Sequence, residues 1–224
     1  MVRSKQGFVR GMLTSALGAA MLGGVAGGLL CGGESRAAEQ LVLEAFQAKE
    51  ADGFPSLWEN ESQRSEARAR NAYKVHDEQG SGFLAARDAD QRIKKKKIDW
   101  DPKAFPLLTW RWRLVKAPAT AEPIATLYVS LDTDFFFIPV FTKYMWSASK
   151  TEGMLSEGSM FSGAEIVVQS GAEPVGEWIE ETVNVYEDFK RIHQHEPAPK
   201  AWGISILSGP GVEIDFGSIV AKAR

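Results

Sequence analysis

The side chains that could bind a ligand gather in the middle of the sequence. Two arginines alternate with tryptophans in the run 108–114, and further basic and aromatic residues follow at 128 and 143–146. Cationic groups bind anionic or hydroxyl-rich ligands, and aromatic rings pack against the apolar faces of sugars. We therefore predict a ligand-binding set from these positions. Its members are Arg111, Arg113, Tyr128, Lys143, Tyr144 and Trp146.

The same residues also have structural interpretations. The tryptophans that alternate with the arginines share a face with leucines, which is typical of a buried core stripe. On the opposite face, Arg111 and Arg113 either pair with acids such as Glu181 across the sheet or form a cationic floor for an anionic ligand. Tyr144 and Trp146 also share one face, and they form either a sugar-stacking platform or a buried pair.

A basic run at 92–97, with the sequence RIKKKK, is the strongest charge feature of the chain. Lysines on an edge strand prevent its pairing with other molecules, so one interpretation is a protected, exposed edge. The other interpretation is a patch that binds an acidic polysaccharide or anionic lipid headgroups.

The sequence contains no complete catalytic or metal-binding motif. His193 and His195 have no evident third ligand, and Cys31 is the one cysteine of the chain. The adjacent acids at 180–181 and 187–188 give no sign of facing each other across a cleft, as glycosidase carboxylates must. We therefore predict no metal and no cofactor. A non-catalytic domain is favoured, with an enzyme kept as the alternative.

The first 37 residues have the pattern of a secretory signal sequence. Three basic residues lie in the first ten positions, no charged residue occurs from 11 to 33, and small residues precede a cut after Ala37. We predict that the chain is exported and that the signal is cleaved, which places the protein in the periplasm or outside the cell. Two alternatives retain the chain at the membrane: lipidation at Cys31, or an uncleaved apolar anchor.

The charge balance argues against a nucleic-acid-binding protein. The net charge is −3, and residues 1–37 hold four basic residues and one acid, so the remainder has 22 basic and 28 acidic residues. A nucleic-acid-binding domain normally has a basic surface. We predict a glycan as the partner and no nucleic acid, with membrane contact only through the leader.

Alternation of apolar and polar residues predicts the fold. In the run 106–114, the leucines and tryptophans lie on one face, and the two arginines lie on the other. Further strands are predicted at 124–132, 141–147, 165–170, 178–185, 202–207 and 212–220. One helix is predicted after Asn184, ended by Pro197. Many short strands separated by turns predict an all-β fold, an antiparallel β-sandwich with one or two short helices. We expect a lead-in at 38–57 and the sandwich at 58–224.

Several motifs, in order, resemble an uncharacterised bacterial family, domain of unknown function 3047. They are PLLTWRWR at 106–113, KYMWS at 143–147, VVQSG at 167–171 with GEW at 176–178, NVYEDFKR at 184–191 and WGISI at 202–206. The likeness extends from about 58 to 219. It implies a jelly-roll of the galactose-binding or carbohydrate-binding type, although a fold does not determine a function.

The chain departs from this family at two places. The family has paired aspartates before the strand that begins here near 124, and an aspartate-rich segment after the strand that ends near 207; here these places read ATAE and SGPG. A cation site formed by those acids would be lost. The resemblance favours a non-catalytic domain that binds a carbohydrate or cell-envelope glycan. The alternatives are an enzyme acting on envelope polysaccharide and a structural or protein-interaction module.

Overall fold

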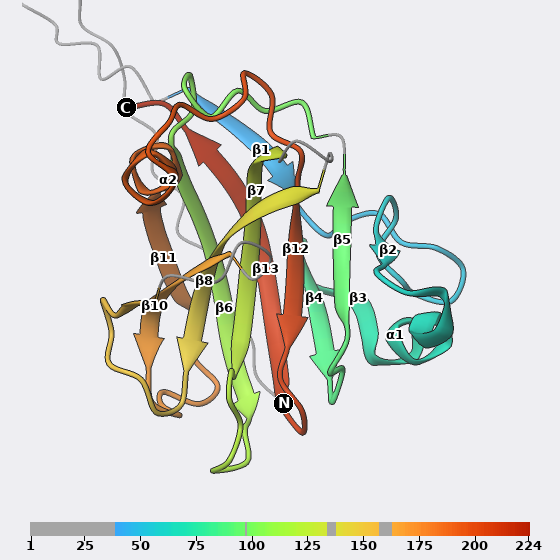
Figure 1. The fold of residues 1–224 in the computed structure, drawn as a ribbon. Helices are drawn as coiled ribbons and strands as arrows, with labels where there is room; N and C mark the ends of the chain where they lie inside the picture. The colour runs from blue at the N-terminus through green and yellow to red at the C-terminus, as the bar shows by residue number, and fades with distance from the viewer. Residues whose placement is uncertain (1–38, 97, 134–137, 157–162) are drawn as a thin grey trace, which may run out of the picture. The chain divides into compact units, whose positions relative to one another are not determined.

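The computed structural model describes residues 39–96, 98–133, 138–156 and 163–224 (Figure 1). The predicted signal sequence, its cleavage site and Cys31 lie outside these residues. The segment 37–224 forms one compact unit. None of the helices in the described ranges is both long enough and apolar enough to span a bilayer.

Two β-sheets face each other in this unit. Sheet I has the strand order β11-β6-β13-β4-β3, and β1 also pairs with β13. Its strands are β1 (Gln40–Glu44), β3 (Tyr73–Glu78), β4 (Ser81–Arg87), β6 (Leu107–Lys116), β11 (Ile179–Asn184) and β13 (Glu213–Lys222). All of its strand pairs are antiparallel.

Sheet II has the order β2-β5-β12-β7-β8-β10-β9. Its strands are β2 (Glu59–Asn60), β5 (Arg92–Lys96), β7 (Ala125–Thr133), β8 (Pro139–Ser147), β9 (Leu155–Ser156), β10 (Ala164–Ser170) and β12 (Gly203–Ser208). Its pairs are antiparallel except β8 with β10, which run parallel. From β4 to β7, and again from β10 to β13, each strand lies in the opposite sheet from the one before it, as in a jelly roll. The predicted antiparallel β-sandwich is confirmed.

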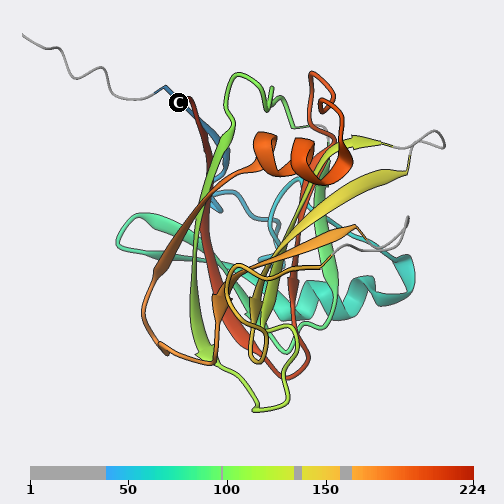
Figure 2. The same cartoon turned by 60° about the vertical axis from the view of Figure 1, so that its left-hand side comes forward.

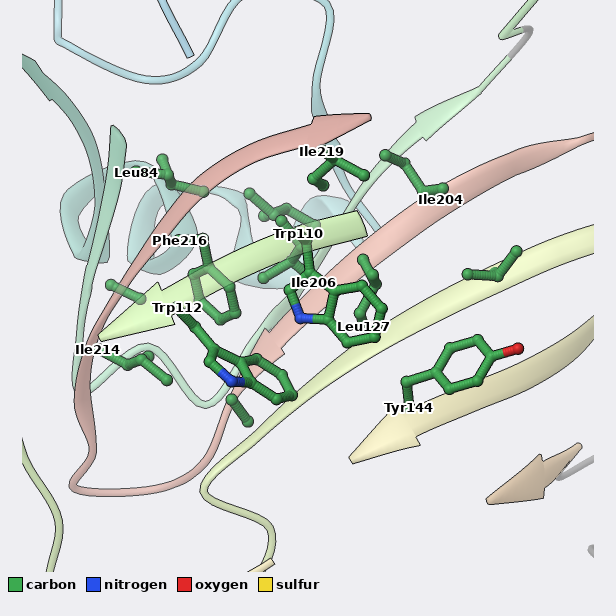
Figure 3. Packing of buried hydrophobic residues seen from close by; sticks show 14 of the residues in the cluster. Leu84, Trp110, Trp112, Leu127, Tyr144, Ile204, Ile206, Ile214, Phe216 and Ile219 are labelled. Atoms are coloured by element: carbon green, nitrogen blue, oxygen red, sulfur yellow. The ribbon is translucent and has the colours of Figure 1, made fainter. Parts of the chain in front are cut away.

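Aromatic side chains fill the space between the sheets. Trp110 and Trp112 extend from β6 toward sheet II, where Tyr144 lies on β8 (Figure 3). The ring centroids of Trp110 and Tyr144 are 5.7 Å apart, and those of Trp112 and Trp146 are 5.6 Å apart. Complete burial of a large apolar side chain contributes about 2–3 kcal/mol of stability. These rings therefore hold the two sheets together.

The segment 38–57, predicted as a lead-in, is part of the sandwich. Strand β1 extends sheet I by pairing with β13. The side chains of Phe46 and Phe54 are almost completely buried in the common core. The compact domain therefore begins about twenty residues earlier than the sequence pattern indicated.

Helix α2 (Val185–His193) lies across one end of the sandwich (Figure 2). As predicted, Asn184 caps it: its side-chain oxygen accepts a hydrogen bond of 3.0 Å from the backbone N–H of Glu187. The helix ends at His193, before Pro197, because Gln194 adopts a left-handed conformation with φ of 59°. A 3-10 turn (Gln63–Ser65) and α1 (Glu66–Ala72) form the other helical segment.

Candidate functional site

The six predicted site residues lie in three separate places. Tyr144 and Trp146 lie between the sheets, the two arginines on the outer face of sheet I, and Tyr128 with Lys143 on the outer face of sheet II. The predicted arrangement, in which Arg111, Arg113 and Lys143 share one binding face, is wrong because β6 and β8 belong to different sheets.

Tyr144 and Trp146 are completely buried, so they offer no platform to a sugar. The Tyr144 hydroxyl donates a 3.1 Å hydrogen bond to the carboxylate of Asp188 on α2, and the Trp146 indole donates a 2.6 Å bond to the Gly171 carbonyl oxygen. Burial raises the pKa of Tyr144 well above its ordinary value, so the phenol stays protonated. The alternative of a buried aromatic pair is the correct one.

Arg113 on sheet I is held by carboxylates. Its Nε and one terminal nitrogen donate bonds of 3.0 and 2.8 Å to Asp215, which is 2% exposed, and its other nitrogen bonds Glu78 at 3.2 Å. Arg87 donates a further 2.7 Å bond to Asp215. The hydrogen bonds from Arg113 lower the pKa of Glu78 below its usual range. Arg113 therefore compensates a buried charge of the fold.

Arg111 lies beside Arg113 and is covered by an aromatic ring. The guanidinium carbons of Arg111 and Arg113 lie 4.6 and 4.4 Å from the ring centre of Trp178. Trp178 in turn donates a 3.3 Å hydrogen bond to Glu78. We call this group of residues the arginine face of sheet I. Arg113 is thus paired with carboxylates, whereas Arg111 contacts the Trp178 ring and its Nε has no hydrogen-bond partner in the described part of the chain.

Glu181, the acid predicted to pair with the arginines, points the other way. It is opposite Trp110 in the β11–β6 register, and its carboxylate accepts a 3.2 Å bond from the indole of Trp112. Burial raises the pKa of Glu181 to about 7. The residue opposite Arg111 is Glu180. Because neighbouring residues of a strand face opposite sides, Glu181 lies on the inner side, one position away from the residue that faces Arg111.

The outer face of sheet II has a polar row that crosses five strands. In register, Lys94 of β5 is opposite Ser205 of β12, which is opposite Tyr128 of β7, then Lys143 of β8 and Glu165 of β10. The strands β5, β12, β7 and β8 lie side by side in Figure 1. This row brings two predicted residues, Tyr128 and Lys143, together with Lys94 of the basic run.

Small residues occupy the middle of this face. Ser205 separates Lys94 from Tyr128, and the next row has Gly203 opposite Ser130. A Cβ atom at Gly203 would overlap the carbonyl oxygen of Lys95, so the backbone packing requires glycine there. Ser205 and Ser130 are 1% and 0% exposed, so the open surface of this face is formed by the larger side chains around them.

The groove consists of three adjoining hollows. The central one, of about 440 Å³, is lined by Arg92, Lys94, Lys96, Tyr128, Phe141, Lys143 and Trp202 among others. A hollow of about 540 Å³ continues from it past Lys96 and Trp202, and one of about 400 Å³ continues past Arg92 and Tyr128. We call the three together the sheet II groove.

Aromatic rings and Arg92 shape the groove. The guanidinium carbon of Arg92 lies 4.8 Å from the ring centres of both Tyr128 and Phe141. A terminal nitrogen of Arg92 also forms an ion pair with the carboxylate of Glu61. Trp202 is half-buried and lines two of the three hollows. Burial raises the pKa of Tyr128, so its phenol remains a hydrogen-bond donor. No partner for this hydroxyl occurs within residues 39–96, 98–133, 138–156 and 163–224.

Most groove cations are paired with acids. Lys96 contacts Glu59 at 2.5 Å, and Lys143 contacts Glu165 at 3.1 Å. Burial raises the pKa of Glu165, but hydrogen bonds from Lys143 and Lys150 outweigh it, so the pKa lies below its ordinary value. Lys94 differs, because it has no ion pair or hydrogen bond through its ammonium group anywhere in the described part of the chain.

The basic run at 92–97 was predicted as a separate feature and not as part of the ligand-binding set. Alternation separates its members: Lys95 turns to the other side and binds Glu44 at 2.8 Å, while Arg92, Lys94 and Lys96 face the groove. Phe141 could have been found, because it shares the strand face of Lys143. Trp202 could not, because alternation groups it with the buried Ile204, whereas β12 begins only at Gly203.

The histidines give no metal centre. The ring centroids of His193 and His195 are 6.3 Å apart, and His195 lies 4.0 Å from Asp132. In the described ranges, no group of three or more histidine, cysteine or acidic side chains is arranged to hold a metal ion. Burial lowers the pKa of His193, so this ring favours its neutral form.

Fold and surface define a β-sandwich with an open groove on one sheet. The family model described as protein of unknown function (DUF3047) matches residues 141–209, which include β8, β10, α2 and β12. The resemblance inferred from the sequence is thereby confirmed over this segment. No curated protein matches the sequence.

Solved β-sandwich structures resemble the domain only distantly. A family 28 carbohydrate-binding module specific for non-crystalline cellulose has 16% identity and a TM-score of 0.41, with 83% of this chain and 92% of that chain covered. The K1 cleaved adhesin domain of Lys-gingipain from Porphyromonas gingivalis W83 has 15% identity, coverage of 83% and 99%, and a TM-score of 0.43. A family 11 module of a Clostridium thermocellum cellulase has 8% identity, coverage of 84% and 96%, and a TM-score of 0.45.

Proposed function

We propose that this protein is a non-catalytic, extracytoplasmic domain that binds a glycan in the sheet II groove. One observation carries the proposal: the central hollow is lined by the ring of Trp202 and by Tyr128, whose hydroxyl has no hydrogen-bond partner in the described part of the chain. An unpartnered donor beside a hollow is available to a ligand, because no protein group competes for it.

The chemistry of the groove suits a sugar. Sugar rings have apolar C–H faces that pack on aromatic side chains and hydroxyls that both donate and accept hydrogen bonds. Trp202 supplies an aromatic surface, and Tyr128 and Lys94 supply donors. The groove is open along its length, and its three hollows adjoin. This form suits several units of a chain better than one enclosed small molecule.

The acids near the groove favour binding over catalysis. A hydrolase acting on glycosidic bonds needs two carboxylates free to exchange protons across the ligand. Glu59, Glu61 and Glu165 each form an ion pair with a groove cation. Glu181, whose pKa is raised, points between the sheets and away from this face. These three glutamates are therefore engaged by cations of the protein, whereas Asp132 and Asp90 line the two outer hollows without an ion pair to a groove cation in the described residues.

Pairing of the cations also disfavours nucleic acid as the ligand. A phosphate backbone is bound by a continuous row of unneutralised lysines and arginines. Here four of the five cations that line the described groove already have carboxylate partners. The export part of the proposal rests on the signal-sequence pattern of residues 1–37.

A glycan-array screen of the purified protein tests the proposal. We expect binding to at least one polysaccharide, a loss of tenfold or more in Trp202→Ala, and unchanged binding in Arg111→Ala. A denaturation curve of Trp202→Ala checks that the domain remains folded. Binding that persists in Trp202→Ala but disappears in Arg111→Ala would move the site to the arginine face and overturn the proposal.

A further inference from the structure

Lys94 is the one groove cation that the described chain leaves without an acidic partner. Its cross-strand neighbour on β2 is Glu59, but the Glu59 carboxylate contacts Lys96 instead. On the other side, Lys94 faces the short side chain of Ser205. Lys94 lines the central hollow, and no carboxylate in the described part of the chain contacts its ammonium group.

The surroundings of Lys94 disfavour its own charge. Burial lowers the pKa of Lys94, and the nearby cations Lys96 and Arg92 lower it further, while Glu59 acts in the opposite direction. Ser205 and Tyr128, which face it from β12 and β7, are neutral. A negative group placed in the groove would reverse this, because it stabilises the ammonium form.

Tyr128 completes a pair of ligand-binding groups. It lies two strands from Lys94 in the same row, a backbone separation of about 10 Å. The Ser205 side chain between them is too short to connect them. Both residues line the central hollow, where a sugar ring would place a carboxylate at the ammonium group and a hydroxyl or carboxylate oxygen at the phenol.

We propose that the groove selects a polysaccharide that carries carboxylates, such as a polyuronate, with Lys94 binding one carboxylate and Tyr128 donating a hydrogen bond beside it. This inference rests on the proposed glycan binding and specifies the class of ligand. Charge complementarity identifies the class, because Lys94 provides one unneutralised positive charge in the central hollow, whose other described lining groups are neutral or paired.

Matched pairs of polysaccharides test this inference. The full protein is titrated with polygalacturonate, alginate and hyaluronate, and with the same three polymers after reduction of their carboxyl groups. Each is measured with the wild type, Lys94→Gln and Lys116→Gln. Lys116 is 71% exposed on β6 and provides the same chemical change on the other sheet. Vesicles containing phosphatidylglycerol serve as a lipid probe.

We expect at least one acidic polymer to bind, its reduced form to bind tenfold or more weakly, and Lys94→Gln to lose about tenfold while Lys116→Gln is unchanged. Equal binding of the reduced form, or no effect of Lys94→Gln, overturns the carboxylate inference but leaves glycan binding intact. Failure of every glycan, on these polymers and on the array, overturns the proposed function as well. Binding of the vesicles alone, dependent on Lys94, identifies an anionic lipid and contradicts both.

The pH dependence gives a readout that a structural role of Lys94 would not change. Because a carboxylate ligand stabilises the charged ammonium, affinity should be constant at neutral pH and fall as pH rises through the lowered pKa of Lys94. In Lys94→Gln this decrease should disappear. The same decrease in Lys94→Gln would assign it to another group and contradict the inference.

Discussion

The two outer faces of the sandwich carry similar residues but use them differently. On sheet I, Arg113 is bound to two carboxylates, and both arginines lie against Trp178. On sheet II, Lys94 has no acidic partner and the Tyr128 hydroxyl has no hydrogen-bond partner in the described part of the chain. The first face pairs Arg113 with carboxylates and covers Arg111 with an aromatic ring, whereas the second lines an open groove with available donors.

This difference shows that residue type alone does not identify a binding surface. Arginines beside a tryptophan would suit an anionic or sugar ligand, yet here Arg113 compensates Asp215, which is 2% exposed, and Arg111 packs against the Trp178 ring. What distinguishes sheet II is an open groove lined by two donors, Lys94 and Tyr128, that have no partner in the described part of the chain. Changes on sheet I should therefore alter stability, and changes on sheet II should alter binding.

The largest expected effect is on sheet I. Arg113→Ala removes two hydrogen bonds from the buried carboxylate of Asp215 and leaves only Arg87 as its partner. Breaking such a pair should cost about 2–4 kcal/mol of unfolding free energy, measured by urea denaturation, while glycan affinity stays the same. Lower affinity without lower stability would show that the arginine face binds the ligand.

Two tyrosines provide a matched pair for the next test. Tyr144→Phe removes a buried hydrogen bond to Asp188 and should cost about 1–2 kcal/mol of stability with no effect on binding. Tyr128→Phe removes a hydroxyl that has no protein partner, so stability should be unchanged and glycan affinity should fall about three- to tenfold. The reverse result for the two variants would exchange the roles of core and groove.

The smallest expected effect is a gain of affinity. Glu59→Gln removes the carboxylate that contacts Lys96 at 2.5 Å, so the groove acquires a second unpaired ammonium group. Affinity for an acidic glycan should rise about twofold at low salt, because the pair is near the surface and solvent screens it. Isothermal titration calorimetry at two salt concentrations measures this change, and a loss of affinity would show that Glu59 itself contacts the ligand.

Local patterns were sufficient to predict the fold. The alternation in β6 places Leu108, Trp110, Trp112 and Leu114 in the core, all of them 0–2% exposed. Each strand needs only its own sequence to show two faces. The cap at Asn184 is local in the same sense. The sequence at 38–50 fits either a strand or a helix, because Gln40–Glu44 is short and its partner, β13, lies at the far end of the chain.

The site depended on pairings that sequence patterns do not contain. The groove row joins Lys94, Ser205 and Tyr128, which are far apart in the sequence, and its hollow depends on which strands are adjacent. Likewise, the pattern showed that Tyr144 and Trp146 share a face but not that this face is the inner one. Tyr128 and Lys143 were identified because they lie on the outward positions of adjacent strands.

Two tryptophans mark the two faces, so their indole signals report directly on where the ligand binds. Trp202 lines the sheet II groove, and Trp178 covers the arginine face of sheet I. We would record ¹H–¹⁵N spectra of the protein during titration with its glycan ligand, with the indole N–H peaks assigned through Trp202→Phe and Trp178→Phe. If the ligand binds in the sheet II groove, the Trp202 peak shifts progressively to saturation while the Trp178 peak stays in place. A shift of the Trp178 peak with an unmoved Trp202 peak would contradict binding in the groove.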